Sequence, residues 1–277
     1  MSRTTAQIRE HYEIEKALAA RLAAAPKHER AALYKELYDE LFRRVPHHPQ
    51  LLLRESLAAR RAAAERQARF LASLTARNPV FVEIGAGDCL TSLALAGRAY
   101  RVYAIDVSNE ITGRVTPPTN LTLGLSDGCS VPVPPASADL AFSNQLMEHL
   151  HPDDALEQLR NIYAALKPGG AYFCITPNRM SGPHDVSQHF DREACGFHLR
   201  EYRIGELIAL CRDAGFAQFR AYIGKDGRYL RVPIALVGLA EQLTGILPAR
   251  TGKLAPLRLL LGIRLLAIKG TAAAASS

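Results

Sequence analysis

The sequence predicts an α/β fold in which helices cover both faces of a doubly wound, mostly parallel seven-stranded sheet. Three observations carry this prediction. Short apolar runs alternate with helical segments over residues 80–223, and such repetition is typical of a parallel sheet. A glycine-rich turn, Gly85-Ala86-Gly87, follows the first apolar run. The length of 277 residues exceeds the roughly 100–200 residues usual for one domain, so one large domain with extensions fits as well as two small ones.

Residues 1–78 are predicted to form a helical extension. Apolar side chains recur every fourth residue at Ile14, Leu18 and Leu22, and further helices are expected over 29–42 and 51–75. Pro26 ends the first helix, and the dipeptide Asn78-Pro79 closes the whole block, because a residue before proline avoids the helical conformation.

Residues 79–270 are predicted to form the α/β domain, followed by a frayed tail over 271–277. We expect strands at 80–84, 102–105, 121–125, 140–143, 171–176, 217–223 and 263–268. Helices are expected between them, up to residue 97 and over 109–115, 153–166 and 203–214. Ligands of such sheets bind beyond the carboxyl ends of the strands, where the strand order reverses.

A helical insertion over residues 228–262 precedes the last predicted strand. Its helix, over 231–247, is apolar nearly all round. We expect it to be buried against the three N-terminal helices. Three alternatives stay open: it caps a pocket, it docks a partner subunit, or it lies on a membrane beside neighbouring basic residues such as Arg228 and Arg231.

The composition excludes several classes of protein. Apolar residues make up 48% of the chain, which excludes global disorder. The five cysteines are scattered and form no C-x-x-C pair, so we expect neither a zinc site nor a disulfide framework, and a cytoplasmic location. No uncharged apolar run reaches the roughly 18 residues of a membrane span. Acidic residues interrupt the N-terminus before any secretory signal forms.

The net charge of +7 is unevenly distributed. Residues 1–78 carry +6, residues 79–223 carry −5 and residues 224–277 carry +6. Two basic ends indicate an anionic partner, which could be a membrane surface, a phosphorylated substrate or nucleic acid. The alternative is that arginine-rich helices are simply solvated.

A polar site is predicted where the first two strands end. Glycines at Gly85 and Gly87 allow a ligand to approach the backbone at the start of a helix. Asp106 follows Gly85 by 21 residues, and a carboxylate there can accept both ribose hydroxyls of a nucleoside. Position 90 is Leu90 rather than the third glycine of a dinucleotide fingerprint, and Glu83 suits a cationic ligand group.

Five segments, in this order and spacing, resemble the class I S-adenosylmethionine-dependent methyltransferases, and most closely their small-molecule subgroup with the quinone-biosynthesis enzymes. They are residues 82–88, 104–107, 126–128, 138–144 and 166–170. The resemblance covers residues 80–223, with 263–268 as the last, antiparallel strand. It implies a Rossmann-like methyltransferase fold and S-adenosylmethionine as the cofactor.

The resemblance also implies roles for the residues around the first two strand ends. The backbone of Gly85, Ala86 and Gly87 is expected to pass under the methionine part of the cofactor, with Glu83 nearby. Asp106 is expected to bind the ribose hydroxyls.

Further cofactor contacts are implied at the next strand ends. Val107 is expected to pack on the adenine, and Asp127 to accept from the adenine amino group beside the N–H of Gly128. Ser143 and Asn144, after the fourth strand, are expected to line the floor near the sulfonium. Plain turn chemistry is the alternative for Asp127.

The expected catalytic residues are Glu148 and His149, because this pair after the fourth strand recurs in the resembled family. An oxygen acceptor needs a base, and His149 is the candidate. The alternative is a helix-packing histidine. In some relatives an acid three residues earlier completes a metal site, but Gln145 stands there, so we expect no metal.

A second polar cluster lies in the loop before the helix at 203–214. It contains His184, Asp185, His189, Asp191 and His198, which we expect to shape the acceptor pocket or to order the loop. Two basic residues that follow, at positions 200 and 203, could hold an anionic acceptor.

The sequence therefore favours an enzyme that methylates a small molecule, at the oxygen of a sugar, glycan-lipid or quinone-like compound. The acceptor could be anionic or lipid-linked, and contact with a membrane surface through the basic C-terminal region stays open. The alternatives are an RNA or other nucleic-acid methyltransferase, indicated by the pI of about 9.3, and a non-catalytic cofactor-binding scaffold. No basic run interleaves with aromatic residues, which argues against nucleic acid.

Overall fold

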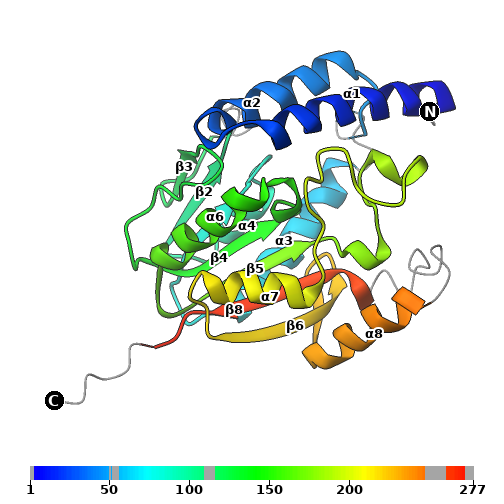
Figure 1. The fold of residues 1–277 in the computed structure, drawn as a ribbon. Coiled ribbons are helices and arrows are strands. Elements are labelled where there is room, and N and C mark those ends of the chain that lie inside the picture. Colours follow the sequence, from blue (N-terminus) through cyan, green and yellow to red (C-terminus); the bar gives the residue numbers. More distant parts are fainter. Residues whose placement is uncertain (1–2, 50, 52–55, 109–115, 247–259, 272–277) are drawn as a thin grey trace.

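A single mixed sheet forms the centre of the molecule (Figure 1). The computed structural model describes residues 3–49, 51, 56–108, 116–246 and 260–271. Within them, eight strands lie in the order β3-β2-β1-β4-β5-β8-β6-β7. They are β1 (Val80–Ile84), β2 (Arg101–Asp106), β3 (Leu121–Leu125), β4 (Ala138–Asn144), β5 (Leu166–Thr176), β6 (Gln218–Lys225), β7 (Arg228–Val232) and β8 (Ile263–Ile268).

The strand directions confirm the predicted fold class and place its switch point. The pairs β1–β2, β1–β4, β2–β3 and β4–β5 are parallel, whereas β8 runs antiparallel to both β5 and β6. The chain leaves β1 toward β2 on one side and later returns to β4 on the other. The carboxyl ends of β1 and β4 therefore border the crevice in which ligands of such sheets bind.

The predicted seven strands become eight because β7 folds back on β6. The two strands form an antiparallel hairpin with Lys225 opposite Arg228, and the tight turn places Asp226 and Gly227 at positive φ. The sequence predicts this segment as the start of the helical insertion, so that part of the prediction is wrong. The expected helix at 109–115 and the frayed end at 272–277 lie outside the described residues.

Helices cover both faces of the sheet. On one face α6 (Pro152–Ala165) and α7 (Ile204–Asp213) pack in a core that also includes α1 (Thr5–Ala24) and α2 (Lys27–Arg44). On the other face α3 (Leu57–Ser73) and α4 (Leu90–Ala96) form a second core. Leucine is the most frequent residue in both cores, which also contain alanine, isoleucine, valine and aromatic side chains.

A buried ion pair docks α2 on α6. Nε and Nη2 of Arg30 donate to the two carboxylate oxygens of Asp154 at 2.7 and 2.6 Å, so the pair is bidentate. The hydroxyl of Tyr34 donates to Asp154 at 2.9 Å and accepts from the N–H of His151 at 2.8 Å. Arg30 and Asp154 are only 4% and 2% exposed. The N-terminal helices are therefore fixed to the α/β domain by charge as well as by apolar packing.

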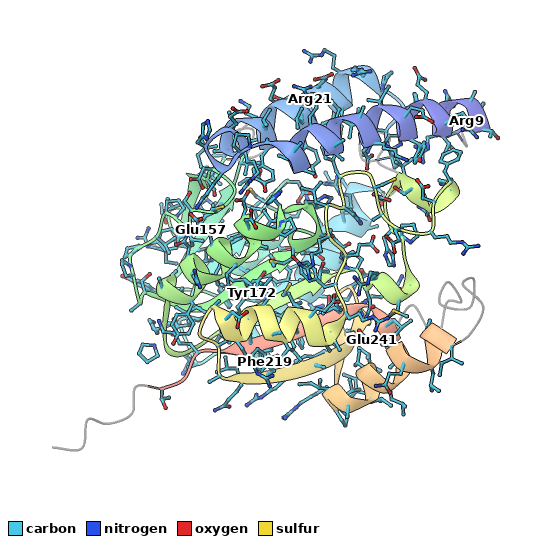
Figure 2. The ribbon with its side chains drawn as sticks, in the orientation of Figure 1. Arg9, Arg21, Glu157, Tyr172, Phe219 and Glu241 are labelled. Atoms are coloured by element: carbon cyan, nitrogen blue, oxygen red, sulfur yellow. The ribbon has the colours of Figure 1, made fainter. Side chains whose placement is uncertain are left out.

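The expectation that the inserted helix is buried against the N-terminal helices is wrong. Helix α8 (Ile234–Ile246) packs on α7, on β6 and on the turn Arg179–Ser181, at the opposite end of the molecule from α1 and α2 (Figure 1). Its anchor is the buried Glu241, labelled in Figure 2, which accepts from Asn178 Nδ2 at 2.6 Å and from the N–H of Ile204 at 2.7 Å. None of the helices in the described part of the chain is long and apolar enough to cross a membrane.

Candidate functional site

The turn after β1 leaves room for a ligand at its backbone. Gly85 and Gly87 have φ values of +71° and +50°, which glycine adopts without strain. The N–H of Gly85 donates to the carbonyl of Ile105 at 2.8 Å, which ties the turn to β2. A Cβ atom added at Gly87 would meet no atom within 4 Å, whereas one at Gly85 would lie 3.2 Å from Leu146.

Asp106, the last residue of β2, lies directly beside this turn. Its Oδ2 accepts from the N–H of Gly87 at 2.8 Å, and its Oδ1 accepts from the N–H of Ser108 at 3.1 Å. A carboxylate has about four acceptor positions, so these two bonds orient it and leave capacity for two hydroxyl donors. Val107 follows and is half-buried. The structure thus brings together Asp106, the residue predicted to bind the ribose, and the turn predicted to bind the methionine part.

Glu83 is buried and bonds to helix α4. The hydroxyl of Ser92 donates to its carboxyl group, and burial raises the pKa of Glu83 to about 8. Glu83 is therefore largely protonated at pH 7. A cationic ligand group placed beside it would favour the ionised form and lower this pKa.

The residue in the left-handed conformation at the start of α4 is Cys89, not position 90, where a dinucleotide fingerprint has its third glycine. Cys89 has φ +58° and is the N-cap of α4. Leu90 is the first residue of that helix. The Cys89 side chain is fully buried in a small cluster with Ala86 and Ala104. Because the left-handed residue here is a cysteine, a search of the sequence for glycines does not find this turn.

The turn after β3 is held by its own side chains. Burial works against ionisation of Asp127, but backbone N–H groups, first that of Ser130 at 2.7 Å, outweigh it and lower its pKa. Gly128 has φ +96°, and a Cβ atom there would lie 2.9 Å from the ring of Tyr34. The Gly128 N–H, expected beside the adenine, donates to Ser126 Oγ at 3.0 Å. Asp127 remains exposed at this edge.

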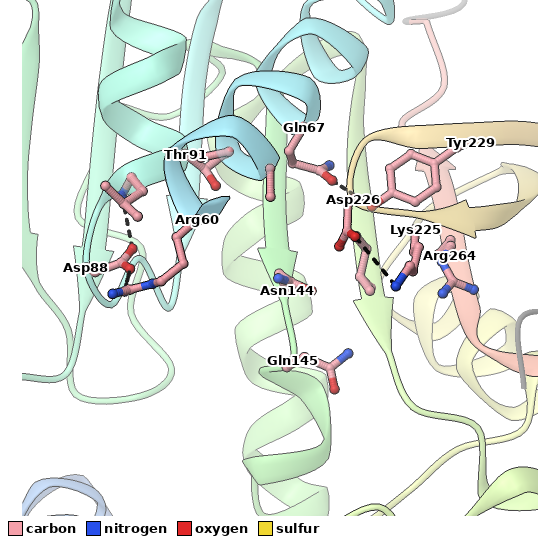
Figure 3. Close-up of a pocket in the computed structure, with 14 residues that line it drawn as sticks. Arg60, Gln67, Asp88, Thr91, Asn144, Gln145, Lys225, Asp226, Tyr229 and Arg264 are labelled. Carbon is pink, nitrogen blue, oxygen red and sulfur yellow. Dashed lines mark hydrogen bonds and ion pairs between the residues drawn. The ribbon is translucent and has the colours of Figure 1, made fainter. Parts of the chain in front are cut away.

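The two predicted residues at the end of β4 point in different directions. Ser143 is fully buried, and its hydroxyl lies 2.5 Å from that of Tyr172 inside the core. Asn144 is exposed and lines a pocket of about 340 Å³ (Figure 3). Gln145, which follows at φ +55°, lines the same pocket.

This pocket lies at the carboxyl edge of the sheet on the side of α3 and α4. Its walls come from α3, the loop after β1, the end of β4, the β6–β7 turn and the start of β8. Asp88 and Thr91 line the end next to the glycine turn, and Lys225 and Tyr229 line the far end (Figure 3). The residues from α3 and from the hairpin belong to no sequence motif, so they could not be predicted as site residues from the sequence.

His149 lies outside the pocket lining, on the side of α2. Its Nδ1 is 3.0 Å from the carbonyl oxygen of Phe197 and 2.8 Å from the hydroxyl of Tyr38. A carbonyl only accepts, so Nδ1 carries the hydrogen and Nε2 keeps its lone pair. Burial, reinforced by the nearby His198, lowers the pKa of His149 to about 3. The imidazole is therefore neutral at physiological pH.

Glu148 is fully enclosed and cannot contact a substrate directly. Its Oε2 accepts from Thr176 Oγ1 at 2.8 Å, while Oε1 is buried with no hydrogen-bond partner among the described residues. Burial raises its pKa to about 7. Ligand atoms of Glu148, His149 and His198 lie within 4.8 Å of one another, so these three could hold a metal ion. The expectation of no metal rested on Gln145 and stays a prediction.

The histidines of the 184–198 loop are held by one buried carboxylate. Glu201 lies 3.1 Å from His184 Nδ1 and 2.7 Å from His198 Nδ1. Burial opposes its ionisation, but these two bonds outweigh the penalty and lower the pKa of Glu201 to about 2. Asp185 accepts from the N–H of Ser187 at 2.9 Å. These bonds order the loop.

The other predicted members of this region also lie outside the pocket lining. Asp191 accepts from the hydroxyl of Tyr12 in α1 at 2.5 Å, and His189 lies in a short turn, Val186–His189. Arg200 lies over the ring of Tyr202. Arg203 is exposed at the N-cap of α7. None of these side chains lines the pocket at the end of β4.

Sequence comparisons match the part of the chain that contains these strand ends. Residues 82–174 match a family model described as a methyltransferase domain. A probable S-adenosylmethionine-dependent methyltransferase of Mycolicibacterium smegmatis is 30% identical over 138 residues, or 49% of this chain and 51% of that protein. Another, of Mycobacterium tuberculosis, is 29% identical over 136 residues, 49% and 47% of the two chains. The chain thus spans about half the length of these curated relatives.

Solved methyltransferase structures share the fold. Burkholderia thailandensis 1,6-didemethyltoxoflavin-N1-methyltransferase, solved with 1,6-didemethyltoxoflavin and S-adenosylhomocysteine, superimposes with a TM-score of 0.53 over 89% of this chain and 91% of that one, at 18% identity. An S-adenosylmethionine-dependent methyltransferase of Mesorhizobium loti gives a TM-score of 0.50 over 74% and 98%, also at 18% identity. At a sequence identity of 18%, the similarity to these structures shows a shared fold and nothing more.

Proposed function

We propose that this chain, whose residues 82–174 match a methyltransferase domain, is an S-adenosylmethionine-dependent methyltransferase that acts on a small molecule. The observation that carries the proposal is the carboxylate of Asp106, bonded to Gly87 at the switch point of the sheet. We further propose oxygen of a sugar, glycan-lipid or quinone-like compound as the acceptor atom, as in the quinone-biosynthesis subgroup that the sequence resembles.

The test is calorimetric titration of the full chain with S-adenosylmethionine and S-adenosylhomocysteine, with NAD as the control. We expect micromolar binding of both sulfur compounds. We expect no binding of NAD, because position 90 is leucine where a dinucleotide-binding turn has its third glycine. Binding of NAD alone would contradict the proposal.

Methyl transfer is an in-line displacement at carbon. The acceptor oxygen attacks the methyl group, the carbon–sulfur bond breaks, its electron pair stays on sulfur, and the hydroxyl proton passes to a base. The donor is already activated, so alignment of the reactants supplies much of the catalysis, of order 7–11 kcal/mol. In this proposal Asp106 holds the ribose, Asp127 the adenine, and Asn144 faces the reacting groups.

We assign His149 as the base, acting through Nε2, with Glu148 as a positioning residue beneath it. Replacing His149 by alanine is expected to lower kcat about 100-fold and to change the affinity for S-adenosylhomocysteine less than twofold. Because the pKa of His149 is about 3, kcat is expected to show no loss through this group between pH 5 and 8. Turnover is measured with the acceptor that a screen of the three proposed compound classes identifies.

The matched control is Tyr38→Phe, which removes the hydroxyl 2.8 Å from His149 Nδ1 and keeps the ring. We expect a much smaller decrease, since Phe197 still holds the imidazole. If His149→Ala keeps the wild-type kcat, the assignment is wrong.

We also propose that α8 rests on an anionic membrane surface. Four large apolar side chains form one stripe of this helix and are 43–83% exposed: Leu236, Leu239, Leu243 and Ile246. Arg220 and Arg231 line a groove at the start of the helix together with Ile234. An apolar stripe beside arginines is typical of a helix that binds the headgroup region of anionic lipids.

Co-sedimentation with vesicles tests this contact. We expect the protein to sediment with phosphatidylglycerol vesicles and not with phosphatidylcholine vesicles, and Leu239→Gln/Leu243→Gln to lose most of the binding. Tyr100→Ala, which removes an exposed aromatic side chain far from α8, is the control. Concentration-dependent dimers that this double variant abolishes, without vesicle binding, would instead assign the stripe to a second copy of the chain.

A further inference from the structure

The polar wall of the pocket at the end of β4 consists mostly of hydrogen-bond donors. Arg60, Lys225 and Arg264 line it, against two acids, Asp88 and Asp226. Arg60 pairs with Asp88 at one end and Lys225 with Asp226 at 3.8 Å at the other (Figure 3). The pocket lining therefore holds three cationic and two acidic side chains.

The amide of Gln67 is the most specific sign of a ligand. Gln67 is 7% exposed, and its Oε1 accepts from the hydroxyl of Tyr229 at 2.6 Å. Its Nε2 is buried and has no hydrogen-bond partner among the described residues. A buried donor without an acceptor costs free energy, which a ligand oxygen placed in the pocket recovers. The bond to Tyr229 keeps the amide in this orientation (Figure 3).

The walls of the pocket place such a ligand next to the proposed cofactor. Thr91 lies just beyond the glycine turn, and Asn144 and Gln145 lie at the carboxyl end of β4. The volume of about 340 Å³ matches the lower end of the range for small-molecule sites, roughly 300–1,000 Å³. A ligand bound in this pocket would contact Asn144 at the carboxyl end of β4, at the edge of the sheet.

We propose that this pocket binds a carboxylate or phosphate group of the methyl acceptor, with Gln67, Arg264 and Lys225 as its donors. The proposal rests on the proposed function and narrows its substrate class to anionic small molecules. The same chemistry could come from a second source, the carboxylate of the cofactor's own methionine part, and the experiment separates the two.

The probes are benzoate, its neutral counterpart benzamide, and inorganic phosphate, each titrated into the full chain saturated with S-adenosylhomocysteine. We expect benzoate or phosphate to raise the melting temperature and benzamide to leave it unchanged. Gln67→Leu is expected to weaken the anion's binding at least tenfold, and Gln67→Glu, which keeps the shape and the Tyr229 bond, to abolish it. If neither anion binds the saturated protein, the proposal is wrong.

Charge is tested by a matched pair of variants. Lys225→Gln removes a cation from the pocket and is expected to weaken anion binding at least threefold. Arg160→Gln removes an exposed cation of α6 that lies outside the pocket lining and should leave anion binding unchanged. If both variants lose the same anion affinity, only the net charge of the protein attracts the anion. That result would contradict a specific binding site in this pocket.

Cofactor affinity distinguishes the two sources. Gln67→Leu should leave the affinities for S-adenosylhomocysteine and for 5′-methylthioadenosine, which lacks the amino-acid part, unchanged. A loss for S-adenosylhomocysteine alone, with anions binding only the unsaturated protein, would assign the pocket to the cofactor and overturn the acceptor proposal. If the protein binds anions but neither S-adenosylhomocysteine nor 5′-methylthioadenosine, the pocket is an anion site and the proposed methyltransferase function is wrong.

Discussion

Replacing Asp106 by alanine is expected to weaken binding of S-adenosylhomocysteine by ~10²–10⁴-fold. Two hydroxyl bonds to a carboxylate are lost, and each charged hydrogen bond contributes about 1.5–3 kcal/mol. The variant also frees the N–H groups of Gly87 and Ser108, which Asp106 now orients. The loop beneath the methionine part thus loses its support together with the ribose ligand. Calorimetric titration of wild type and variant measures the ratio directly.

Asp139→Ala is the matched control. Asp139 also accepts two hydrogen bonds, from the N–H of Val80 at 2.8 Å and from Lys167 Nζ at 2.7 Å, but it lies at the amino end of the strands. We expect its loss to lower stability slightly and to leave cofactor affinity within twofold of wild type. An Asp106→Ala protein that is folded and binds S-adenosylhomocysteine normally would exclude Asp106 as the ribose ligand.

Replacing Asp154 by alanine is expected to lower the free energy of unfolding by about 3–5 kcal/mol, because it leaves the buried Arg30 without its counter-ion. Urea denaturation followed by circular dichroism measures the change. The double variant Arg30→Met/Asp154→Leu should recover most of the loss, since an apolar pair of similar volume replaces both charges. Glu40→Ala, which breaks ion pairs with the half-exposed Arg21 and Arg44, should cost less than about 1 kcal/mol.

The same pair predicts a pH dependence. Burial alone would raise the pKa of Asp154, but the bonds from Arg30 and Tyr34 outweigh it and hold the pKa below its usual value. The stabilisation is therefore complete above the unfolded-state pKa of about 3.9 and is lost as the pH falls through the folded value. Wild type should lose stability below pH 4 more steeply than Asp154→Ala. Equal slopes would show that Asp154 ionises alike in both states.

The elements that local patterns determine were predictable from the sequence. β1 lies at the predicted residues and β2 extends one residue beyond the prediction at each end, because these strands are largely buried and contain apolar runs. β5 begins at Leu166, five residues before the predicted strand at 171–176. Asp106 and the glycine turn meet because the carboxyl ends of neighbouring parallel strands meet at one edge. The spacing of these residues along the chain was therefore sufficient to predict that Asp106 and the glycine turn lie together.

The remainder depends on contacts between distant segments. Arg30 and Asp154 are separated by 124 positions and Gln67 and Tyr229 by 162, so no local periodicity links them. The hairpin strand β7 was missed because its side chains are mostly exposed and show no apolar run. Ser143 was expected to line the cofactor site, yet the alternation of side chains along β4 turns it into the core.

The outer strand β7 also bears on how these molecules behave when crowded. It ends the sheet on the side of β6, and an edge strand offers unpaired backbone groups to any other strand. Arg228 and Arg231 are exposed on this short strand. Two copies approaching edge to edge would bring these guanidinium groups together and repel each other, a natural protection against aggregation through the sheet. Replacing both arginines with valine would remove that protection while leaving the hairpin pattern intact.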